Sequence, residues 1–147
     1  MSELEKIVLT ACLTLIGGVL LLVAGQVITR FVVDPLLDFR RLLGEVAYAL
    51  ILNAKWLCNP NATADRPEFQ EAKDECRKLA SRLHAFSAAV PLYNFLTDLG
   101  VVPPLSDVYA ARGHLIGLSN MDGKIPIDVV KKHRDEIARL LRIRVDD

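Results

Sequence analysis

Three polar side chains at helical spacing offer the clearest chemistry in the chain. Gln26, Arg30 and Asp34 recur every four residues, so a helix would place them on one face. Polar groups at membrane depth usually face water or the interior of a helix assembly. In a symmetric oligomer Arg30 would form a ring of positive charge, and such rings favour anions in a pore. The alternative interpretation is that Arg30 extends to the lipid headgroups and only anchors the helix.

A second candidate site consists of cations in the later part of the chain. A cationic patch is strengthened when an oligomer repeats it around an axis, and it then attracts phosphate groups. The alternative is a solvated helix face, because the chain as a whole is balanced at 18 basic and 18 acidic residues. The C-terminal region is crowded with Lys124, Lys131, Lys132, Arg134, Arg139, Arg142 and Arg144. The residues that we predict to bind a phosphate-bearing ligand are Arg77, Lys78, Arg82, Lys131, Lys132 and Arg139.

Other site chemistry finds little support in the sequence. There is no phosphate-binding glycine loop, no nucleophile elbow and no metal pair at helical spacing. His84, His114 and His133 fall on three different predicted helices, so we do not expect them to form a metal site. The three cysteines fit no disulfide framework or zinc motif, and we expect them to be reduced. We therefore predict no enzymatic activity, no cofactor and no bound metal.

Gln26 and Arg30 are positioned by an uncharged stretch from Ile7 to Thr29, which we call the apolar segment. About 20 apolar residues suffice to cross a bilayer core, so this segment is long enough. A cleaved signal peptide is disfavoured, because the preceding residues 2–6 are acidic and such peptides carry only about 7–15 apolar residues. A buried core helix is disfavoured because little of the 147-residue chain remains to surround it. We predict one transmembrane helix.

Flanking cations indicate how this helix is oriented. Only Lys6 precedes the apolar segment, whereas Arg30, Arg40, Arg41 and Lys55 follow it. Cytoplasmic loops carry an excess of lysine and arginine. We therefore predict a single-pass protein with a periplasmic N-terminus, a membrane region at residues 1–34 and a cytoplasmic domain at residues 35–147.

One face of the apolar segment suggests contact with other helices. Ala11, Gly18 and Gly25 recur every seven residues, which predicts a helix-packing face. In lipid, helices associate through close packing of small residues, and a seven-residue repeat favours a left-handed assembly. Glycine and alanine are also common in such helices without any contact, which is the alternative. Thr14, Leu21 and Ile28 interleave with the small residues; the predicted pore lining or mouth comprises Thr14, Gly18, Leu21, Gly25, Gln26 and Arg30.

The remaining chain predicts a small helical bundle. Asp34 and Pro35 form a helix-start signal, a capping residue followed by proline, and we expect them to act as a hinge. Asp65 and Ser106 are predicted to cap later helices, and Trp56 is expected near the core. No alternating strand pattern appears, so the fold class is all-α. The predicted helices cover residues 36–57, 67–90, 92–99, 107–118 and 126–142, with turns at residues 59–64 and 120–123.

Several short motifs resemble a group of small bacterial single-span membrane proteins, most of which have no assigned role. The group shares a Gly-Gln motif in the span and a Pro-x4-Arg-x3-Gly-Glu stretch just after it. The matching residues are Gly25-Gln26, Phe31, Asp34-Pro35, residues 40–47 (Arg-Arg-Leu-Leu-Gly-Glu-Val-Ala), Asn59-Pro60 and residues 115–120 (Leu-Ile-Gly-Leu-Ser-Asn).

The group also resembles the membrane effector of the Hailong antiphage defence system. That effector is a homo-tetrameric channel, kept closed by single-stranded DNA oligomers that a partner nucleotidyltransferase makes. The resemblance implies a tetramer in the bacterial inner membrane, an oligonucleotide site in the cytoplasmic domain and a nucleotidyltransferase partner. The ligand residues named above rest on charge alone. The sequence thus predicts a ligand-gated, anion-conducting channel, and the alternative is a membrane-anchored protein-interaction module without transport.

Overall fold

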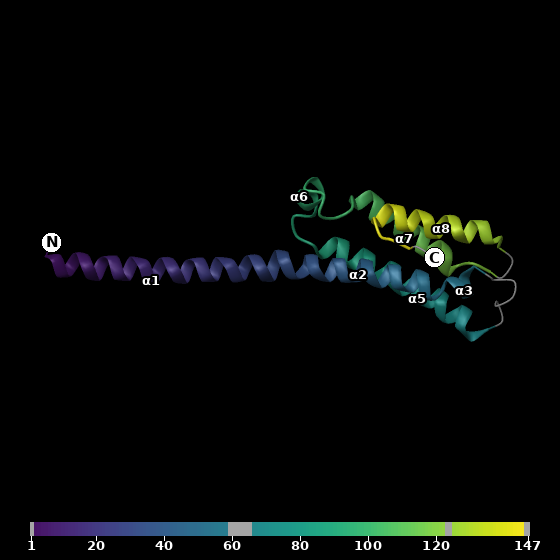
Figure 1. The fold of residues 1–147 in the computed structure, drawn as a ribbon, viewed down its shortest axis with the longest axis horizontal. Coiled ribbons are helices and arrows are strands. Elements are labelled where there is room, and N and C mark those ends of the chain that lie inside the picture. The colour runs from purple at the N-terminus through teal and green to yellow at the C-terminus, as the bar shows by residue number, and fades with distance from the viewer. Residues whose placement is uncertain (1, 59–65, 123–124, 146–147) are drawn as a thin grey trace.

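The computed structural model describes residues 2–58, 66–122 and 125–145, and all the regular structure in these ranges is helical. Figure 1 shows two parts, a long rod at the N-terminal end and a bundle that contains the later helices. The predicted all-α fold class is confirmed for the residues described.

The rod is one unbroken helix made of three consecutive elements. These are α1 (Glu3–Ile28), the π-helical turn η1 (Thr29–Val33) and α2 (Asp34–Leu52). Together they cover 50 residues, which corresponds to roughly 75 Å at about 1.5 Å per residue. A capping box starts the helix: the Glu5 N–H donates to the Ser2 hydroxyl, and the Ser2 N–H donates to the Glu5 carboxylate.

No described residue of α1 is buried, and its leucines, valines and isoleucines are exposed in every direction. A helix that is apolar all round belongs in a protein core or in a membrane. None of the residues that the structure describes surrounds α1, and the helix is long and apolar enough to cross a membrane.

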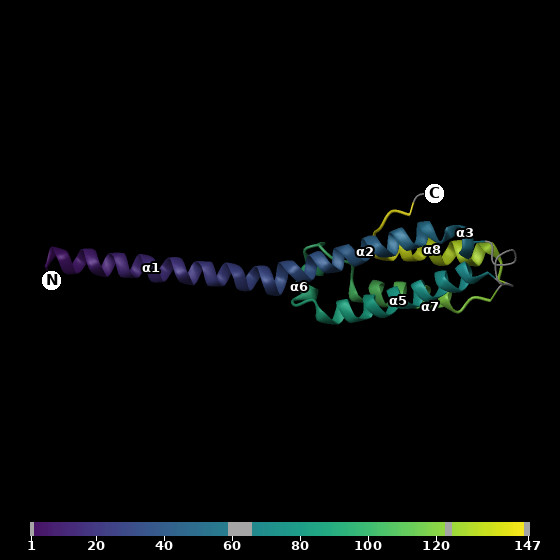
Figure 2. The ribbon, with the colours of Figure 1, turned by 90° about the horizontal axis from the view of Figure 1, so that it is seen from below.

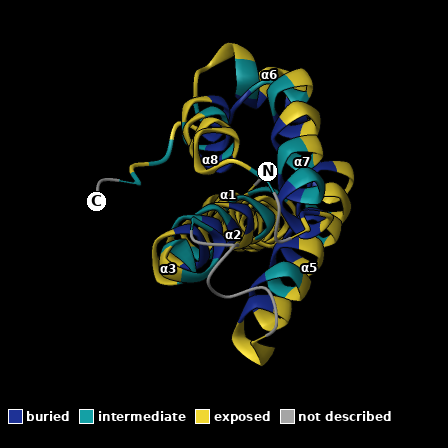
Figure 3. Cartoon of the chain, turned by 90° about the vertical axis from the view of Figure 1, so that its right-hand side faces the viewer, coloured by how far each residue is buried: buried dark blue, intermediate teal, exposed yellow. Residues whose placement is uncertain are grey.

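The bundle packs around α7 (Leu105–Ser119). This helix lies against α5 (Pro67–Ala89) and α8 (Ile127–Leu141), and α2 packs against α5 (Figures 2 and 3). Two short helices, α3 (Ala54–Leu57) and α6 (Tyr93–Asp98), complete the described part.

The bundle core follows the helical periodicity of the sequence. On α5 the residues Phe69, Ala72, Cys76, Leu79 and Leu83 are buried at spacings of three or four, as one face of a helix requires. On α8 the buried residues include Val130, Ile137 and Leu141. Trp56 packs partly buried against the core, as expected. The largest fully buried side chains include Phe39, Phe69, Leu42, Leu50, Leu79, Leu83, Leu115, Leu118 and Ile137.

The predicted helix start at Asp34 was wrong. Asp34 has helical backbone angles, φ −60° and ψ −50°, and its N–H bonds to the Thr29 carbonyl five residues back. Pro35 lacks an N–H, and its ring would clash with the carbonyl of residue 31 in a regular α-helix. A π-turn inserts one extra residue at this point, so the helix accommodates the proline without ending. The sequence pattern alone predicted a helix cap here. Asp34 and Pro35 therefore lie inside a continuous helix, and their role as a hinge stays a prediction.

Other helix bounds differ in smaller ways. The single helix predicted over residues 36–57 ends at Leu52, and α3 follows after Asn53. Ser106 does not cap α7, because the helix already begins at Leu105, after Pro104. Helices α5, α6 and α8 agree with the predicted ranges to within a residue at each end. The cap at Asp65, the loop at residues 59–64 and Gly123 of the predicted turn lie outside the described residues.

Candidate functional site

The small-residue face of α1 is open. Ala11, Gly18 and Gly25 are exposed, and a Cβ added to either glycine would meet nothing within 4 Å. Thr14, Leu21 and Ile28 between them are exposed as well. Small residues matter in membrane helices because they let a second backbone come close. This face therefore offers a packing surface that the chain itself leaves uncovered.

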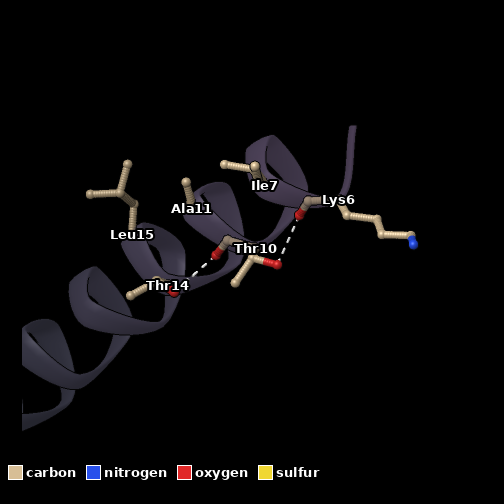
Figure 4. Close-up of a pocket in the computed structure, with 6 residues that line it drawn as sticks. All are labelled: Lys6, Ile7, Thr10, Ala11, Thr14 and Leu15. Carbon is tan, nitrogen blue, oxygen red and sulfur yellow. Dashed lines mark hydrogen bonds between the residues drawn. The ribbon is translucent and has the colours of Figure 1, made fainter. Parts of the chain in front are cut away.

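The N-terminal end of this face carries a shallow apolar hollow, shown in Figure 4. Its two threonines direct their hydroxyls back along the helix, Thr10 to the Lys6 carbonyl at 2.8 Å and Thr14 to the Thr10 carbonyl at 2.9 Å. Because these hydroxyls are satisfied within the helix, the surface presented outward is mainly methyl groups. It is suited to packing against another apolar helix or lipid.

Gln26 and Arg30 are the polar side chains of this stretch that have no internal partner. Thr29 donates to the Gly25 carbonyl at 2.9 Å, as the other threonines do one turn back. Among the residues that the structure describes, no hydrogen bond or ion pair engages the side chains of Gln26 and Arg30, and Arg30 forms no salt bridge with Asp34. An amide without a hydrogen-bond partner has a high free-energy cost in the hydrocarbon of a bilayer. If this stretch lies in lipid, Gln26 needs a hydrogen-bond partner from outside this copy of the chain.

The predicted ligand cations fall into two groups on different helices. Arg77, Lys78 and Arg82 belong to α5, whereas Lys131, Lys132 and Arg139 belong to α8. Helix α7 packs against both (Figure 3), and a single chain does not bring the two groups into one site.

Several of these cations already have partners. Lys78 lies 3.8 Å from Glu75, and Arg139 lies 2.7 Å from Glu136, each one turn away on its own helix. Arg77 donates to the side-chain oxygen of Asn120 at 3.1 Å. Lys131 and Lys132 are exposed, and among the residues that the structure describes neither of them forms a salt bridge.

Arg82 plays a structural part that the sequence did not indicate. Its guanidinium makes a two-pronged hydrogen bond with Glu45 and so joins α5 to α2. The hydrogen bond from Arg82 lowers the pKa of Glu45, and the same bond raises the pKa of Arg82. Both side chains are 38% exposed, so water screens the pair and its contribution to stability is modest. Arg82 links two helices, and it is less available to a ligand than the sequence suggested.

Two of the three histidines, which lie on different helices, come into contact. The Nδ1 atoms of His114 on α7 and His133 on α8 lie 2.8 Å from each other. Burial lowers the pKa of His133, and the charges of His114 and Lys132 lower it further. The His133 ring lies over Gly117, where an added Cβ would come within 2.9 Å of it.

The third histidine does not join this pair. His84 lies beside Tyr109, with 5.8 Å between ring centroids. No group of three potential metal ligands occurs among the described residues. The contact between His114 and His133 could not be predicted from their spacing in the sequence. Gly117 permits it, because a glycine leaves room for the His133 ring against α7.

No protein-family model, curated protein or solved structure matches this chain.

Proposed function

We propose that this chain forms a homo-oligomeric channel in the bacterial inner membrane, with its apolar segment lining the pore and its bundle in the cytoplasm. The observation that carries the proposal is the unbroken helix from Glu3 to Leu52, whose first half is uncovered and whose second half is embedded in the bundle. Such a helix mechanically couples the two parts.

The polar and small residues of α1 support self-association. The open face at Ala11, Gly18 and Gly25 accepts a neighbouring helix, and Gln26 and Arg30 gain partners or water when several copies meet. Arg30 stands at the cytoplasmic end of the uncharged stretch, so copies around an axis would form a cationic mouth. That charge favours passage of anions.

Ion flux from liposomes that contain the purified protein tests this proposal. We expect anion leakage from the wild type and a changed anion preference in Arg30→Ala. Arg41→Ala is the matched control, because Arg41 is an exposed arginine of the same helix beyond the apolar segment, and it should conduct as the wild type does. No flux from protein shown to be inserted, under any ligand tried, would contradict the channel.

We further propose that the bundle gates the pore by binding a phosphate-bearing ligand such as an oligonucleotide, in the setting of antiphage defence. Among the described residues, Arg77, Lys131 and Lys132 are the predicted cations that form no salt bridge, and an oligomer would repeat them around its axis. Adding short single-stranded DNA to the liposomes should reduce flux. The triple variant Arg77→Gln/Lys131→Gln/Lys132→Gln should need more DNA for the same reduction, whereas Lys73→Gln should respond as the wild type does.

One observation favours a second function, a membrane-anchored module that binds a protein partner. Tyr48, Ile51 and Leu52 are exposed together near the end of α2, at helical spacing that places them on one face. Exposed apolar patches often mark interaction sites. Replacing residues 7–29 with an unrelated apolar helix distinguishes the two functions, because an anchor should tolerate the exchange and a pore should not.

A further inference from the structure

Helix α6 presents an apolar face that the bundle does not cover. Leu92, Phe95 and Leu99 are 65%, 58% and 60% exposed. Phe95 and Leu99 lie one turn apart on one side of the helix, and Leu92 directly precedes it. Three large exposed apolar side chains are costly in water, at about 25 cal/mol for each Å² exposed.

The residue that precedes α6 has a strained backbone conformation. Leu92 has φ 53° and ψ 31°, in the left-handed region that costs a residue with a side chain roughly 1–2 kcal/mol. Strain of this kind persists only where the surroundings impose it, and it gathers at functional positions. Here the surroundings are firm: Tyr93 packs edge-on against Phe39, and its buried hydroxyl donates to the Pro103 carbonyl at 2.8 Å.

The far end of α6 is fixed as well. Gly100, with φ 71°, turns the chain so that its N–H bonds to the Thr97 carbonyl, and the Val101 N–H bonds to the Leu96 carbonyl. This is a typical glycine helix end. The contact between Tyr93 and Phe39 thus joins the start of α6 to α2, and the turn at Gly100 ends the helix.

That position is the end of the bundle nearest α1. Figures 1 and 2 both show α6 as the bundle element closest to the apolar segment. Its contact residue Phe39 lies roughly 9 Å beyond Val33, at about 1.5 Å per residue. A helix with its side chains has a radius of about 5–6 Å, and the headgroup zone on each side of a bilayer is about 5–7 Å deep. Side chains at the start of α6 are therefore within reach of a bilayer surface at the level of Val33.

The positive charges beside α6 are also suited to contact with a lipid bilayer surface. Arg40 and Arg142, both exposed, line a hollow of about 230 Å³ together with Phe39 and residues 100–103. Arginines at this level can bind lipid phosphates while the apolar side chains enter the upper acyl region, as in helices that lie in the membrane interface.

We propose that α6 docks on the cytoplasmic surface of the bilayer through Leu92, Phe95 and Leu99. The inference rests on the proposed membrane location of the apolar segment. This contact would fix the height and tilt of the bundle, and so the angle at which the continuous helix leaves the membrane.

Fluorescence quenching by lipid tests this contact. Trp56, the only tryptophan of the chain, is first replaced by phenylalanine, and single tryptophans are then introduced in this background. The variants are Phe95→Trp on α6, Leu20→Trp in the apolar segment and Tyr48→Trp, an exposed aromatic position on α2 farther from the membrane. Each is placed in liposomes of phosphatidylcholine brominated either near the headgroup end or near the tail end of its chains, and circular dichroism confirms equal helix content.

We expect the Phe95→Trp variant to lose roughly half of its emission with the headgroup-end bromines and little with the tail-end ones. The Leu20→Trp variant should be quenched by tail-end bromines, and the Tyr48→Trp variant by neither. If only the Leu20→Trp variant is quenched, α6 does not touch lipid and the inference is overturned, while the membrane location of the apolar segment stands. A face of α6 that is covered by a second copy of the chain would give this result. If the Leu20→Trp variant is not quenched, the membrane location fails and the inference with it. Equal quenching of the Tyr48→Trp and Phe95→Trp variants would overturn the assignment to α6.

Discussion

Leu21 in α1 and Leu83 in α5 carry the same side chain in opposite surroundings. Leu21 is 77% exposed, whereas Leu83 is 0% exposed. The bundle buries its apolar side chains within the chain, so its stability depends on its own packing. Helix α1 buries none, so under the proposed function lipid or other copies cover it. Substitutions in the bundle should therefore act on folding, whereas substitutions in α1 should act on assembly.

The sharpest test of this contrast is truncation of one leucine in each region. Leu83→Ala should lower the free energy of unfolding of the bundle by about 2–5 kcal/mol, because it removes buried methyl groups and leaves a cavity. Leu22→Ala, at an exposed position of α1, should leave it unchanged. Denaturant unfolding in detergent, followed by the fluorescence of Trp56, measures both. Equal losses would show that α1 takes part in the folded core.

Within α7, alanine substitutions at two glycines should change the free energy of unfolding in opposite directions. An added Cβ at Gly117 would lie 2.9 Å from His133, so Gly117→Ala should destabilise the bundle by about 1–3 kcal/mol through overpacking. Gly113→Ala meets nothing within 4 Å and should stabilise the helix by about 1 kcal/mol, because alanine favours the helix more than glycine does. Thermal unfolding of both variants checks the pair. Stabilisation by both would mean that the His133 ring does not lie over α7.

The sequence could predict which face of a helix is buried, but not which side chains of two helices meet. The inward residues of α5 and α8 follow from periodicity, because burial of one helix face repeats at three and four residues. Which side chains of two different helices meet depends on helix packing angles, which no local pattern encodes. The contact between His114 and His133, and the bond from Arg82 to Glu45, were missed for this reason.

The missed features at Asp34 and Arg134 have different causes. The Asp34-Pro35 pair is compatible both with a helix start and with a π-turn in a continuous helix, and only the surrounding helix decides between them. Arg134 was grouped with surface cations, yet it is buried and its Nη1 lies 3.6 Å from the Cys58 sulfur. By contrast, the apolar segment was evident from the sequence because its signal is composition alone.

Acid should weaken the bundle through His133. Its pKa in the folded protein is below the ordinary value of 6.5, so above that pH the residue is neutral in both states and imposes no cost. As pH falls through 6.5, the unfolded chain binds the proton more readily, and the free energy of unfolding decreases until the pH is below the folded pKa. The melting temperature should therefore be lower at pH of about 5.5 than at about 7.5. His133→Gln should reduce this difference, whereas His84→Gln should preserve it.

The smallest effect is expected at the pair between Arg82 and Glu45. Since both side chains are 38% exposed, a double-mutant cycle with Glu45→Gln and Arg82→Gln should give a coupling energy of about 0.2–1 kcal/mol. The pair between Lys78 and Glu75, 3.8 Å apart within α5, is the matched control and should give less. A coupling no larger than that of the control would remove this link between α2 and α5.

We expect copies of the chain to meet through the small-residue face of α1. Counting the subunits of each complex by single-molecule photobleaching in lipid vesicles tests this contact. We expect several wild-type copies in each complex and single copies for Gly18→Ile/Gly25→Ile, because isoleucine keeps the neighbouring backbone away. Gly17→Ile, next to this face and equally open, should assemble as the wild type does. Single copies of the wild-type protein in lipid would contradict the account.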